Sequence, residues 1–426
     1  MVILLKCKLI FHNGKQFDEL IDSPQNLIID LQNMIDWLHD IHTNDMLDFI
    51  EAFGNSIISN SNSNFASTIK HLSDFFKRDN LQRELELSLR GNYLILDNFV
   101  KLDKGGDKLY HVQPRGLSVH WIAGNVDELG IISIIQALIT KNVSLIKSPS
   151  NYENLLELIH ILQKTKTKKL SGEDIVKTIS LIYLEQDDEK NQKLISEEAD
   201  VRIIWGGLDA VSSIISLPKK PFCEDIVFGP KYSYVILDEE AVSKSDLPVK
   251  LAFDISIFDQ NACSSPHTIF IETNDITILN SFGKKLSIAM EQVNKLIPKK
   301  PISESKAMEI HEIRSENEFS GTVFSSKDTS WTIIVSSDNT LAKPCFSRVV
   351  FVKPISDAMN LTTSNNKKIQ TVGIMMNKEK RLKLIDKLSL QGGDRSPTIG
   401  SMSTYENPWD GMFVMDRLVR WVSTYN

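Results

Sequence analysis

The sequence predicts an α/β protein with two Rossmann-like lobes, each built on a parallel sheet, and a cleft between them. Three observations carry this prediction. Strand-like and helix-like segments alternate from residue 116 onward. A second alternating block begins near residue 250. The chain has 426 residues, which is more than one compact core usually holds.

The first part of the chain, residues 1–110, is predicted to form one or two short strands followed by helices. In 26–42 and 46–60 the apolar residues recur at spacings of three and four, which is the pattern of an amphipathic helix. Residues 59–68 are rich in Ser and Asn and are predicted to form a loop.

From residue 116 strands and helices alternate. The strand-like segments are "GLSVHWIAGNV", "VSLIKSPS", "ISLIYLE" and "VRIIWGG", and helix-like runs such as "ELGIISIIQALITKN" and "NYENLLELIHILQKT" separate them. Strands connected by helices of this length form parallel βαβ units. The block near 250 contains the strand-like "TIFIET", "WTIIVSS" and "RVVFVKP", and the chain is expected to end in an amphipathic helix.

Composition excludes several classes of protein. Apolar residues make up 42% and charged residues 24% of the chain, as in ordinary globular proteins. A net charge of −7 argues against a nucleic acid partner. The four cysteines form no CxxC pair, so we expect no metal, no disulfide framework and a reducing, cytoplasmic location. No apolar run reaches the ~18 residues of a membrane span, and the start is too short and lysine-interrupted for a signal peptide.

Six segments together resemble one known family. They are "HWIAGNV…ALITKNVSLIKSPS", "WGGLDAV", "FGPKYSYVILDEEAV", "FDQNACSSPHTIFIE", "QTVGI" and "NPWDGM…LVRWV". In this order they are similar to the acyl-CoA reductase family typified by LuxC, the bacterial bioluminescence fatty-acid reductase. That family is a divergent branch of the aldehyde dehydrogenase superfamily. The resemblance covers roughly residues 100–426, and the first hundred residues match nothing that we can name.

The resemblance implies an aldehyde dehydrogenase-like fold divided into four parts. These are an N-terminal segment (1–110), a nucleotide-binding α/β domain (111–247), a catalytic α/β domain (248–390) and a C-terminal segment with a final helix (391–426).

Cys263 lies in "FDQNACSSPHTIFIE" and resembles the catalytic cysteine of the superfamily. A thiolate attacks a thioester readily, and the acyl-cysteine that forms is still electrophilic enough to accept hydride. The alternative is a small buried core residue, which is the commonest fate of an intracellular cysteine. Cys7, Cys223 and Cys345 occur in no such motif and are expected to be structural.

Asn125, in "AGNV", matches the position where the superfamily has an asparagine after its strand. The resemblance implies that its side-chain amide, with the backbone N–H of Cys263, stabilises the oxyanion formed during thioester attack. The alternative is an ordinary turn asparagine in a Gly-Asn pair.

The resemblance also implies a nicotinamide cofactor site. "VSLIKSPS" is similar to the superfamily's KPxE strand end, so Lys147 would hold the adenosine ribose or its phosphate. Ser150 replaces a glutamate of NAD-preferring relatives and would tolerate a 2′-phosphate, which favours NADPH. Alternatively, Lys147 is a solvated strand end and Ser150 caps a helix that begins at Asn151.

Other cofactor contacts follow from the same resemblance. Gly206 and Gly207 match the Gly-Ser turn at a helix start, where backbone N–H groups approach a pyrophosphate. A plain strand-to-helix turn would be equally rich in glycine. The remaining expected contacts are Ile122, Ala123, Ser148 and Gly229. The chain lacks GxGxxG, as does the superfamily.

Val227 stands where hydrolytic aldehyde dehydrogenases carry the glutamate of "ELGGK" that activates water. Without that base, the acyl-cysteine is expected to survive hydrolysis. Pro230 replaces the second glycine of the same motif, which leaves the shape of that turn open.

Two histidines lie near these motifs, His120 on an apolar strand and His267 four residues beyond Cys263. Either could act as a proton donor, but a core histidine is the favoured interpretation for each. The "PWDGM" segment (408–412) is interpreted as a family signature or as a tight turn that packs Trp409.

The resemblance thus predicts NADPH-dependent reduction of an acyl thioester, of the fatty acyl kind, to an aldehyde through an acyl-cysteine. The donor is acyl-CoA, an acyl carrier or an acyl-protein. The alternatives are a CoA-acylating aldehyde dehydrogenase working oxidatively and an acyl-accepting subunit of a ligase–reductase complex. An acyl-activating ligase or acyl-protein synthetase is the implied partner, and superfamily relatives usually pair through a strand, which predicts a homo-oligomer.

Overall fold

The computed structural model describes residues 7–59, 72–102, 105–124, 130–361 and 368–425. They form two compact units, Met1–Gly229 with Tyr405–Asn426, and Pro230–Thr404. This division differs from the expected boundary at 247/248, because the strand that follows Pro230 pairs within the second sheet. The expected C-terminal segment, 391–426, is likewise divided between the two units.

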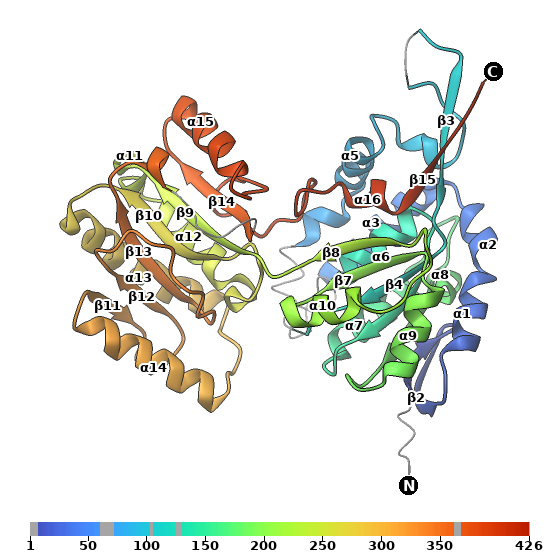
Figure 1. The fold of residues 1–426 in the computed structure, drawn as a ribbon, viewed down its shortest axis with the longest axis horizontal. Coiled ribbons are helices and arrows are strands. Elements are labelled where there is room, and N and C mark those ends of the chain that lie inside the picture. The colour runs from blue at the N-terminus through green and yellow to red at the C-terminus, as the bar shows by residue number, and fades with distance from the viewer. Residues whose placement is uncertain (1–6, 60–71, 103–104, 125–129, 362–367, 426) are drawn as a thin grey trace. The chain divides into compact units, whose positions relative to one another are not determined.

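The first unit contains a sheet whose strand order is β2-β1-β6-β5-β4-β7-β8. Its strands are β1 (Cys7–His12), β2 (Lys15–Ile21), β4 (Leu117–Trp121), β5 (Val143–Ser148), β6 (Ile179–Tyr183), β7 (Val201–Trp205) and β8 (Glu224–Phe228). β1 and β2 form an antiparallel hairpin at one edge, and β6, β5, β4, β7 and β8 run parallel (Figure 1). The parallel α/β core predicted from the alternation after residue 116 is confirmed.

The strand order reverses once within the parallel part. From β4 the chain moves outward through β5 to β6, then returns across the sheet to β7 and β8 on the other side of β4. The carboxyl ends of β4 and β7 therefore lie side by side where connections leave in opposite directions. In open α/β sheets, ligands bind outside the carboxyl ends of strands at such a reversal.

Helices cover this sheet. The α-helices of the first unit are α1 (Gln25–Gln32), α2 (Ile35–His39), α3 (Thr43–Ser59), α5 (Arg78–Ser88), α6 (Gly130–Ile139), α7 (Glu153–Lys164), α8 (Gly172–Ile175), α9 (Glu189–Glu198), α10 (Leu208–Ile215) and α16 (Val414–Arg417). Short 3₁₀ turns are η1 (Ser73–Phe76), η2 (Tyr93–Leu96) and η4 (Val176–Thr178). α6 is buried on every side, which explains why its sequence is apolar all round.

The end of the chain is a strand rather than the expected amphipathic helix. β15 (Val419–Tyr425) pairs along its full length with β3 (Lys108–Pro114) in an antiparallel ribbon. The helical prediction was wrong because the segment is rich in β-branched and aromatic residues, and because a partner strand distant in sequence accepts its hydrogen bonds. Local periodicity contains no information about that partner.

The second unit has a sheet with the order β11-β12-β13-β10-β9-β14. Its strands are β9 (Tyr232–Leu237), β10 (Pro266–Glu272), β11 (Thr322–Ser325), β12 (Thr332–Val335), β13 (Val349–Ile355) and β14 (Ile369–Met375). All neighbours run parallel except β11, which is antiparallel to β12. A second parallel-rich lobe, as the sequence predicts, is confirmed.

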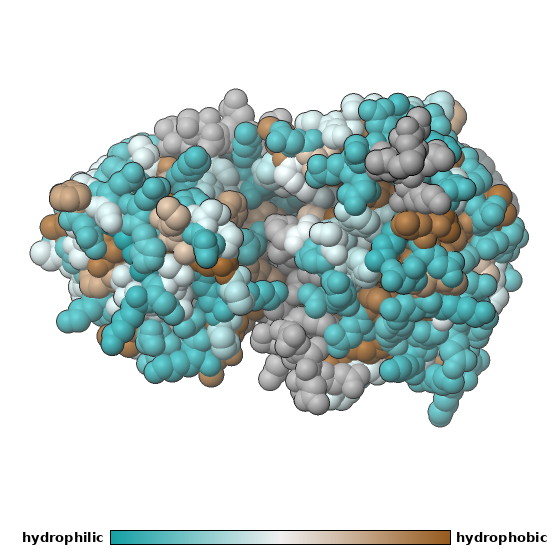
Figure 2. Space-filling view, turned by 90° about the horizontal axis from the view of Figure 1, so that it is seen from below, coloured by the Kyte–Doolittle hydropathy of each residue, from teal (hydrophilic) through white to brown (hydrophobic). Residues whose placement is uncertain are grey.

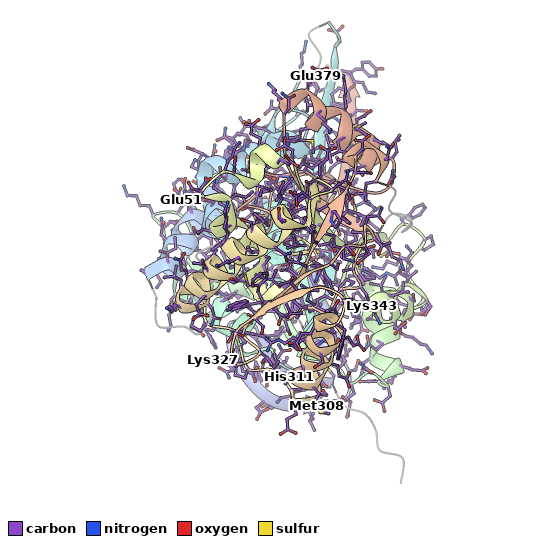
Figure 3. All side chains as sticks on the ribbon, turned by 90° about the vertical axis from the view of Figure 1, so that its left-hand side faces the viewer. Glu51, Met308, His311, Lys327, Lys343 and Glu379 are labelled. Atoms are coloured by element: carbon purple, nitrogen blue, oxygen red, sulfur yellow. The ribbon has the colours of Figure 1, made fainter. Side chains whose placement is uncertain are left out.

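Helices pack on both faces of this second sheet. They are α11 (Glu239–Val242), α12 (Leu247–Ser256), α13 (Ile276–Leu296), α14 (Glu304–Glu318) and α15 (Lys378–Ser389), with 3₁₀ turns η5 (Ile257–Gln260) and η6 (Ala358–Asn360). One core lies between the sheet and α12 and α13, and another lies under α15. Met308 and His311 lie on the outer side of α14, where Met308 is 65% exposed (Figure 3).

Hydrophilic residues predominate on the surface seen in Figure 2, and hydrophobic ones occur in small groups. Within the described ranges, no helix has the length and apolar character needed to cross a membrane.

Candidate functional site

A cavity of about 430 Å³ lies at the strand-order reversal of the first unit. Most of its lining lies at or just beyond the carboxyl ends of four parallel strands: Trp121, Ile122, Ala123 and Gly124 at β4; Lys147, Pro149 and Ser150 at β5; Tyr183, Leu184 and Gln186 at β6; and Trp205, Gly206 and Gly207 at β7. A second cavity of about 560 Å³ shares Trp121, Lys147 and Gln186 and extends between α9 and α10. Six of the expected cofactor residues are therefore brought together at one place.

Lys147 is half-buried at the end of β5, with its ammonium 5.8 Å from the ring centroid of Tyr183. Burial lowers the pKa of Lys147, while the nearby Glu185 carboxylate acts in the opposite direction. Ser150 is exposed at the cavity. The alternative role for Ser150 is wrong, because α7 begins at Glu153 and its N-cap residue is Tyr152.

Two expected contacts lie away from this cavity. Ser148 is fully buried, and its hydroxyl donates to the carbonyl of Ile182 on the neighbouring strand at 3.0 Å. Gly229 follows β8 and is absent from the cavity lining among the described residues. Ser148 thus holds strands together, since its side chain points into the sheet.

Gly207 provides space for a ligand. It begins α10, and a Cβ built on it meets no atom within 4 Å. Next to it, Trp205 stacks on Phe228 with ring centroids 3.8 Å apart, and its indole N–H donates to the Ser133 hydroxyl at 2.8 Å. The turn therefore combines an open backbone with a rigid aromatic wall, and its N–H groups suit an anion.

Several residues that line this cavity were not predicted from the sequence. Trp121, Tyr183 and Gln186 line it, and the Trp121 indole N–H donates to Gln192 Oε1 at 3.1 Å. The signal that would have found them is position: each lies at or just beyond the carboxyl end of a parallel strand at the reversal.

His120 is a core residue. It is fully buried on β4, with Nε2 at 3.0 Å from the Ser118 hydroxyl and 3.2 Å from the Ser144 hydroxyl. Burial lowers the pKa of His120 to about 3, so the imidazole is neutral at ordinary pH. Val227 lies on β8 and is half-buried. Because it is a valine, it provides no carboxylate at this position.

Cys263 lies between η5 and β10 of the second unit, at the amino end of the strand. It is half-buried, and its carbonyl accepts a hydrogen bond from the Ser233 hydroxyl at 2.7 Å. The other three cysteines are buried, and burial raises the pKa of Cys7 to about 12 and of Cys223 and Cys345 to about 11. Of the four thiols, all within the described residues, Cys263 alone is partly accessible.

The backbone before Cys263 adopts a rare conformation. Phe258, Asp259 and Gln260 have φ of 56°, 50° and 65°, in the left-handed region that side chains with a Cβ disfavour. Each such residue costs about 1–3 kcal/mol, and such strain concentrates at functional sites. Tertiary contacts must therefore hold this loop.

The side chain of Gln260 provides one set of these contacts. It is fully buried, its amide N–H₂ donates to the carbonyls of Pro266 at 2.8 Å and Val349 at 3.0 Å, and its oxygen accepts from the Val349 N–H at 2.9 Å. These hydrogen bonds hold the segment that contains Cys263 next to the first residue of β13.

His267 follows Cys263 on β10 and is buried, with its ring edge-on to Phe346. Burial lowers the pKa of His267 to about 4, which leaves it neutral and a poor proton donor near pH 7. Asn125 falls outside the described residues, so its oxyanion role stays a prediction. The described part of the chain contains no group of three His, Cys, Asp or Glu suited to a metal.

The "PWDGM" segment forms a tight turn. Trp409 and Met412 exchange two backbone hydrogen bonds of 2.9 Å, and the buried Trp409 ring stacks on Tyr405. The interpretation as a turn that packs Trp409 is confirmed.

Comparison with known proteins gives consistent findings. A model of the acyl-CoA reductase (LuxC) family matches residues 36–421, so the family extends into the first hundred residues, where the sequence motifs indicated none. The chain is 30% identical over 343 residues to the long-chain acyl-protein thioester reductase of Aliivibrio fischeri, covering 78% of this chain and 68% of that one. The reductase of the same name from Vibrio harveyi is 25% identical, covering 95% and 87% of the two chains.

Solved aldehyde dehydrogenases share the fold. Aldehyde dehydrogenase 21 of Physcomitrella patens superposes with a TM-score of 0.67 over 98% of each chain, at 13% sequence identity.

Proposed function

We propose, from the fact that this chain belongs to the acyl-CoA reductase (LuxC) family, that it reduces a long-chain acyl thioester to an aldehyde. The first unit would be the nucleotide-binding domain and the second the catalytic domain with Cys263. The observation that carries the proposal is the state of Cys263, which is the one partly accessible thiol and follows a strained loop.

The first step is acyl transfer to Cys263. Its thiolate attacks the thioester carbonyl, a new carbon–sulfur bond forms, and the donor thiolate leaves and takes up a proton. The backbone N–H of Cys263 and the side chain of Asn125 are the proposed donors to the oxyanion. One such donor typically contributes ~3–4 kcal/mol to transition-state stabilisation.

The second step reduces the acyl group on Cys263. A dihydronicotinamide cofactor, when bound, would supply the hydride for this step. The thiohemiacetal on sulfur then collapses to the aldehyde and restores the Cys263 thiolate. Val227 supports this outcome, since an apolar side chain cannot activate the water that would compete for the acyl group.

We propose that a dinucleotide binds at the cavity of the first unit. Lys147 and Ser150 would hold the adenosine ribose and its 2′-phosphate, and the Gly206–Gly207 turn would contact the pyrophosphate. We propose NADPH, because Lys147 supplies positive charge and Ser150 places no carboxylate at the phosphate. Glu189 and Asp209 line the neighbouring cavity, and their carboxylates would disfavour a nearby 2′-phosphate. The affinities for NADPH and for NADH therefore both have to be measured.

Partners and location form part of the same proposal. β15 has β3 on one side only within the described ranges, so its other edge is available for a second copy of the chain. We propose a homo-oligomer through this edge, which light scattering on the chain with and without residues 419–425 would test. An acyl-activating ligase is the proposed acyl source, and four free cysteines suit a reducing cytoplasm.

The test is intact-protein mass spectrometry after mixing the chain with acyl-CoAs of several lengths, and with an acyl-protein donor, in the absence of nicotinamide. We expect an adduct of acyl mass on the wild type and on Cys223→Ala, none on Cys263→Ala, and loss of the adduct when NADPH is added. Cys223→Ala is a matched control because it removes a buried thiol. An equal adduct on Cys263→Ala, or none from either donor class, would refute the proposal.

A further inference from the structure

The loop before Cys263 has a counterpart elsewhere in the second unit. Phe346, Ser347 and Arg348 also form a run of left-handed residues, with φ of 59°, 55° and 63°. Together with 258–260, these account for six of the ten non-glycine residues with positive φ among those described. Strained backbone is therefore concentrated in two short segments, one before β10 and one before β13.

The two strained segments are bonded to each other. Arg348 Nε donates to Asp259 Oδ1 at 2.8 Å, and Arg348 Nη2 lies 2.6 Å from the same oxygen. Immediately after these residues, Gln260 and Val349 exchange two further hydrogen bonds. The two left-handed runs are thus joined by the Asp259 and Arg348 side chains, and by the Gln260 side chain, which bonds to the backbone of Val349.

The ion pair is buried and has several further hydrogen bonds. Arg348 is 1% exposed, and its Nη1 donates to Asn294 Oδ1 and the Ile297 carbonyl, both at 3.0 Å. The other carboxylate oxygen of Asp259 accepts from the Lys300 N–H at 3.2 Å. A buried charge with this many partners tolerates little movement, because displacement leaves polar groups unpaired.

The Asp259–Arg348 ion pair holds a residue that lies close in sequence to Cys263, the proposed nucleophile. Asp259 is four residues before Cys263, and Gln260 bonds to Pro266, three residues after it. The segment that contains the Cys263 thiol is consequently held at both ends, at Asp259 by Arg348 and at Pro266 by Gln260. A shift of either anchor changes where the Cys263 sulfur and its backbone N–H point.

We propose that Asp259 and Arg348 are positioning residues that hold the nucleophile loop of Cys263 in its reactive conformation. This inference rests on the proposed role of Cys263 and adds to it the residues that set its geometry. Neither residue contacts the reacting atoms. Their effect is transmitted through the backbone of residues 259–263.

The test compares two conservative arginine substitutions. Arg348→Lys keeps the charge and removes the planar fork that spans Asp259, Asn294 and Ile297. Arg314→Lys is the matched control: Arg314 is 8% exposed in the same unit and bonds to Thr332, the Ser326 carbonyl and the Trp331 carbonyl, but not to the Cys263 loop in the described structure. Asp259→Asn, which preserves shape, is the second variant if Arg348→Lys fails to fold.

Two readouts separate positioning from general stabilisation. One is the rate of Cys263 alkylation by iodoacetamide as a function of pH, and the other is the rate of acyl-adduct formation. In folded Arg348→Lys or Asp259→Asn we expect the adduct rate to fall about 10–100-fold, as for other small displacements of reacting groups, with a changed alkylation profile. Arg314→Lys should stay close to wild type in both.

Each outcome has a defined meaning. Equal alkylation profiles and adduct rates for Arg348→Lys and Arg314→Lys would overturn the positioning role, as would a wild-type profile in Asp259→Asn. If the wild type alkylates at Cys263 but accepts no acyl group, the proposed function fails, while the alkylation comparison still decides the positioning role.

Discussion

In the mechanism that we propose, Val227 favours hydride over water as the reactant that reaches an acyl group on Cys263. The side chain is half-buried on β8, and the sequence resemblance matches it to the glutamate of hydrolytic aldehyde dehydrogenases. The prediction for this residue depends only on its chemical type, which is read directly from the sequence. A β-branched apolar residue cannot remove a proton from water.

We predict that Val227→Glu introduces thioesterase activity. Without nicotinamide, the variant should release CoA from acyl-CoA continuously, since the new carboxylate activates water against the acyl-cysteine. General bases of this kind typically contribute 10²–10⁴-fold, so we expect an increase of about 100-fold or more over wild type in a thiol-release assay. Val227→Gln has nearly the same size without the charge, and an equal increase in that variant would contradict the mechanism.

Ser150 is the residue that we propose determines the preference for NADPH over NADH. We predict that Ser150→Glu shifts the preference from NADPH toward NADH, because a carboxylate repels the 2′-phosphate and accepts hydrogen bonds from ribose hydroxyls. About one to two kcal/mol, or roughly tenfold or more in the ratio of the two dissociation constants, is expected for one added charge near a partly solvated phosphate.

Fluorescence titration of both cofactors measures this ratio, and Ser150→Gln serves as the neutral control. An unchanged ratio in Ser150→Glu would place the specificity determinant elsewhere, with Glu189 and Asp209 as the charged groups to examine next.

At the scale of elements, the alternation of strands and helices could be predicted from sequence, but the partners of the strands could not. β15 resembled a helix because its pairing with β3 is set by residues about three hundred positions earlier in the chain. The left-handed segments escaped prediction for a similar reason. Phe, Gln and Arg carry no local preference for positive φ, and a single Asp, which tolerates it, does not predict a run of three such residues; contacts such as Asp259–Arg348 hold these segments.

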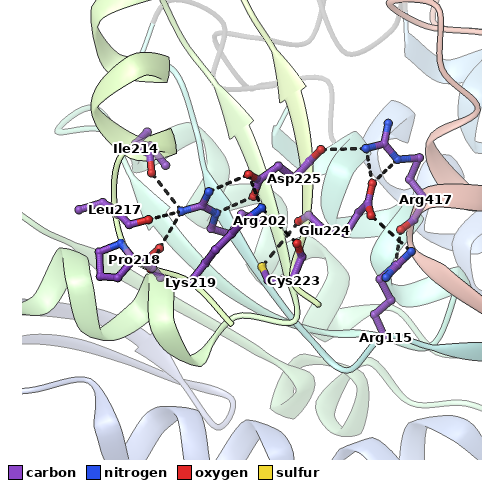
Figure 4. Close-up of polar contacts among 11 residues, drawn as sticks. Arg115, Arg202, Ile214, Leu217, Pro218, Lys219, Cys223, Glu224, Asp225 and Arg417 are labelled. Atoms are coloured by element: carbon purple, nitrogen blue, oxygen red, sulfur yellow. Dashed lines mark hydrogen bonds and ion pairs between the residues drawn. The ribbon is translucent and has the colours of Figure 1, made fainter. Parts of the chain in front are cut away.

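Arg202 connects several elements of the first unit. Its guanidinium is fully buried, binds Asp225 through two hydrogen bonds of 2.6 and 2.7 Å, and donates to the carbonyls of Ile214 and Leu217 near the end of α10 (Figure 4). Next to this pair, Arg417 bonds Glu224 and the Asp225 carbonyl, which ties the C-terminal segment to β8.

We predict that Arg202→Met lowers the free energy of unfolding of the first unit by ~3–5 kcal/mol, because Asp225 loses its main partner in a partly buried position. The double variant Arg202→Met/Asp225→Leu should lose clearly less than the single variant. Urea denaturation of the four members of this cycle measures the coupling. Equal losses in the single and double variants would show that the carbonyl contacts of Arg202, rather than the ion pair, stabilise α10.

At the scale of the whole molecule, two α/β units could be predicted from length and pattern, and the position of their boundary could not. The chain enters the second unit at Pro230 because β9 pairs with β10 and β14, and no composition change marks that point. The family extends to residue 36, further toward the N-terminus than the recognisable motifs, since the N-terminal helices lack residues with distinctive chemistry.

Stability at acid pH is a property of the whole chain to which His120 contributes in a defined direction. Its folded pKa is about 3, below the ~6.5 of an unfolded histidine, so the unfolded state binds the proton first as the pH falls. Stability from the neutral imidazole is therefore complete above pH ~6.5 and is lost progressively toward pH ~3.

We predict that the difference in unfolding free energy between wild type and His120→Asn is constant above pH ~7. Below pH ~6 the wild type should lose its advantage by about 1.4 kcal/mol per pH unit. Denaturation at several pH values between 4.5 and 8 measures this. Asp254 acts in the opposite sense, because burial raises its pKa to about 7, so only the difference between the two proteins isolates His120. A difference independent of pH would mean that the pKa of His120 is the same in the native and unfolded states.

The burial of three cysteines has a practical consequence for chemical labelling. Cys7, Cys223 and Cys345 are buried, and burial raises the pKa of each thiol. A mild thiol reagent applied to the native chain should therefore react with Cys263 alone. A fluorophore or affinity handle could then be attached without removing any residue by mutation. An acyl-mimicking electrophile with such a handle would report, in a crude extract, the fraction of molecules whose thiol is free rather than acylated.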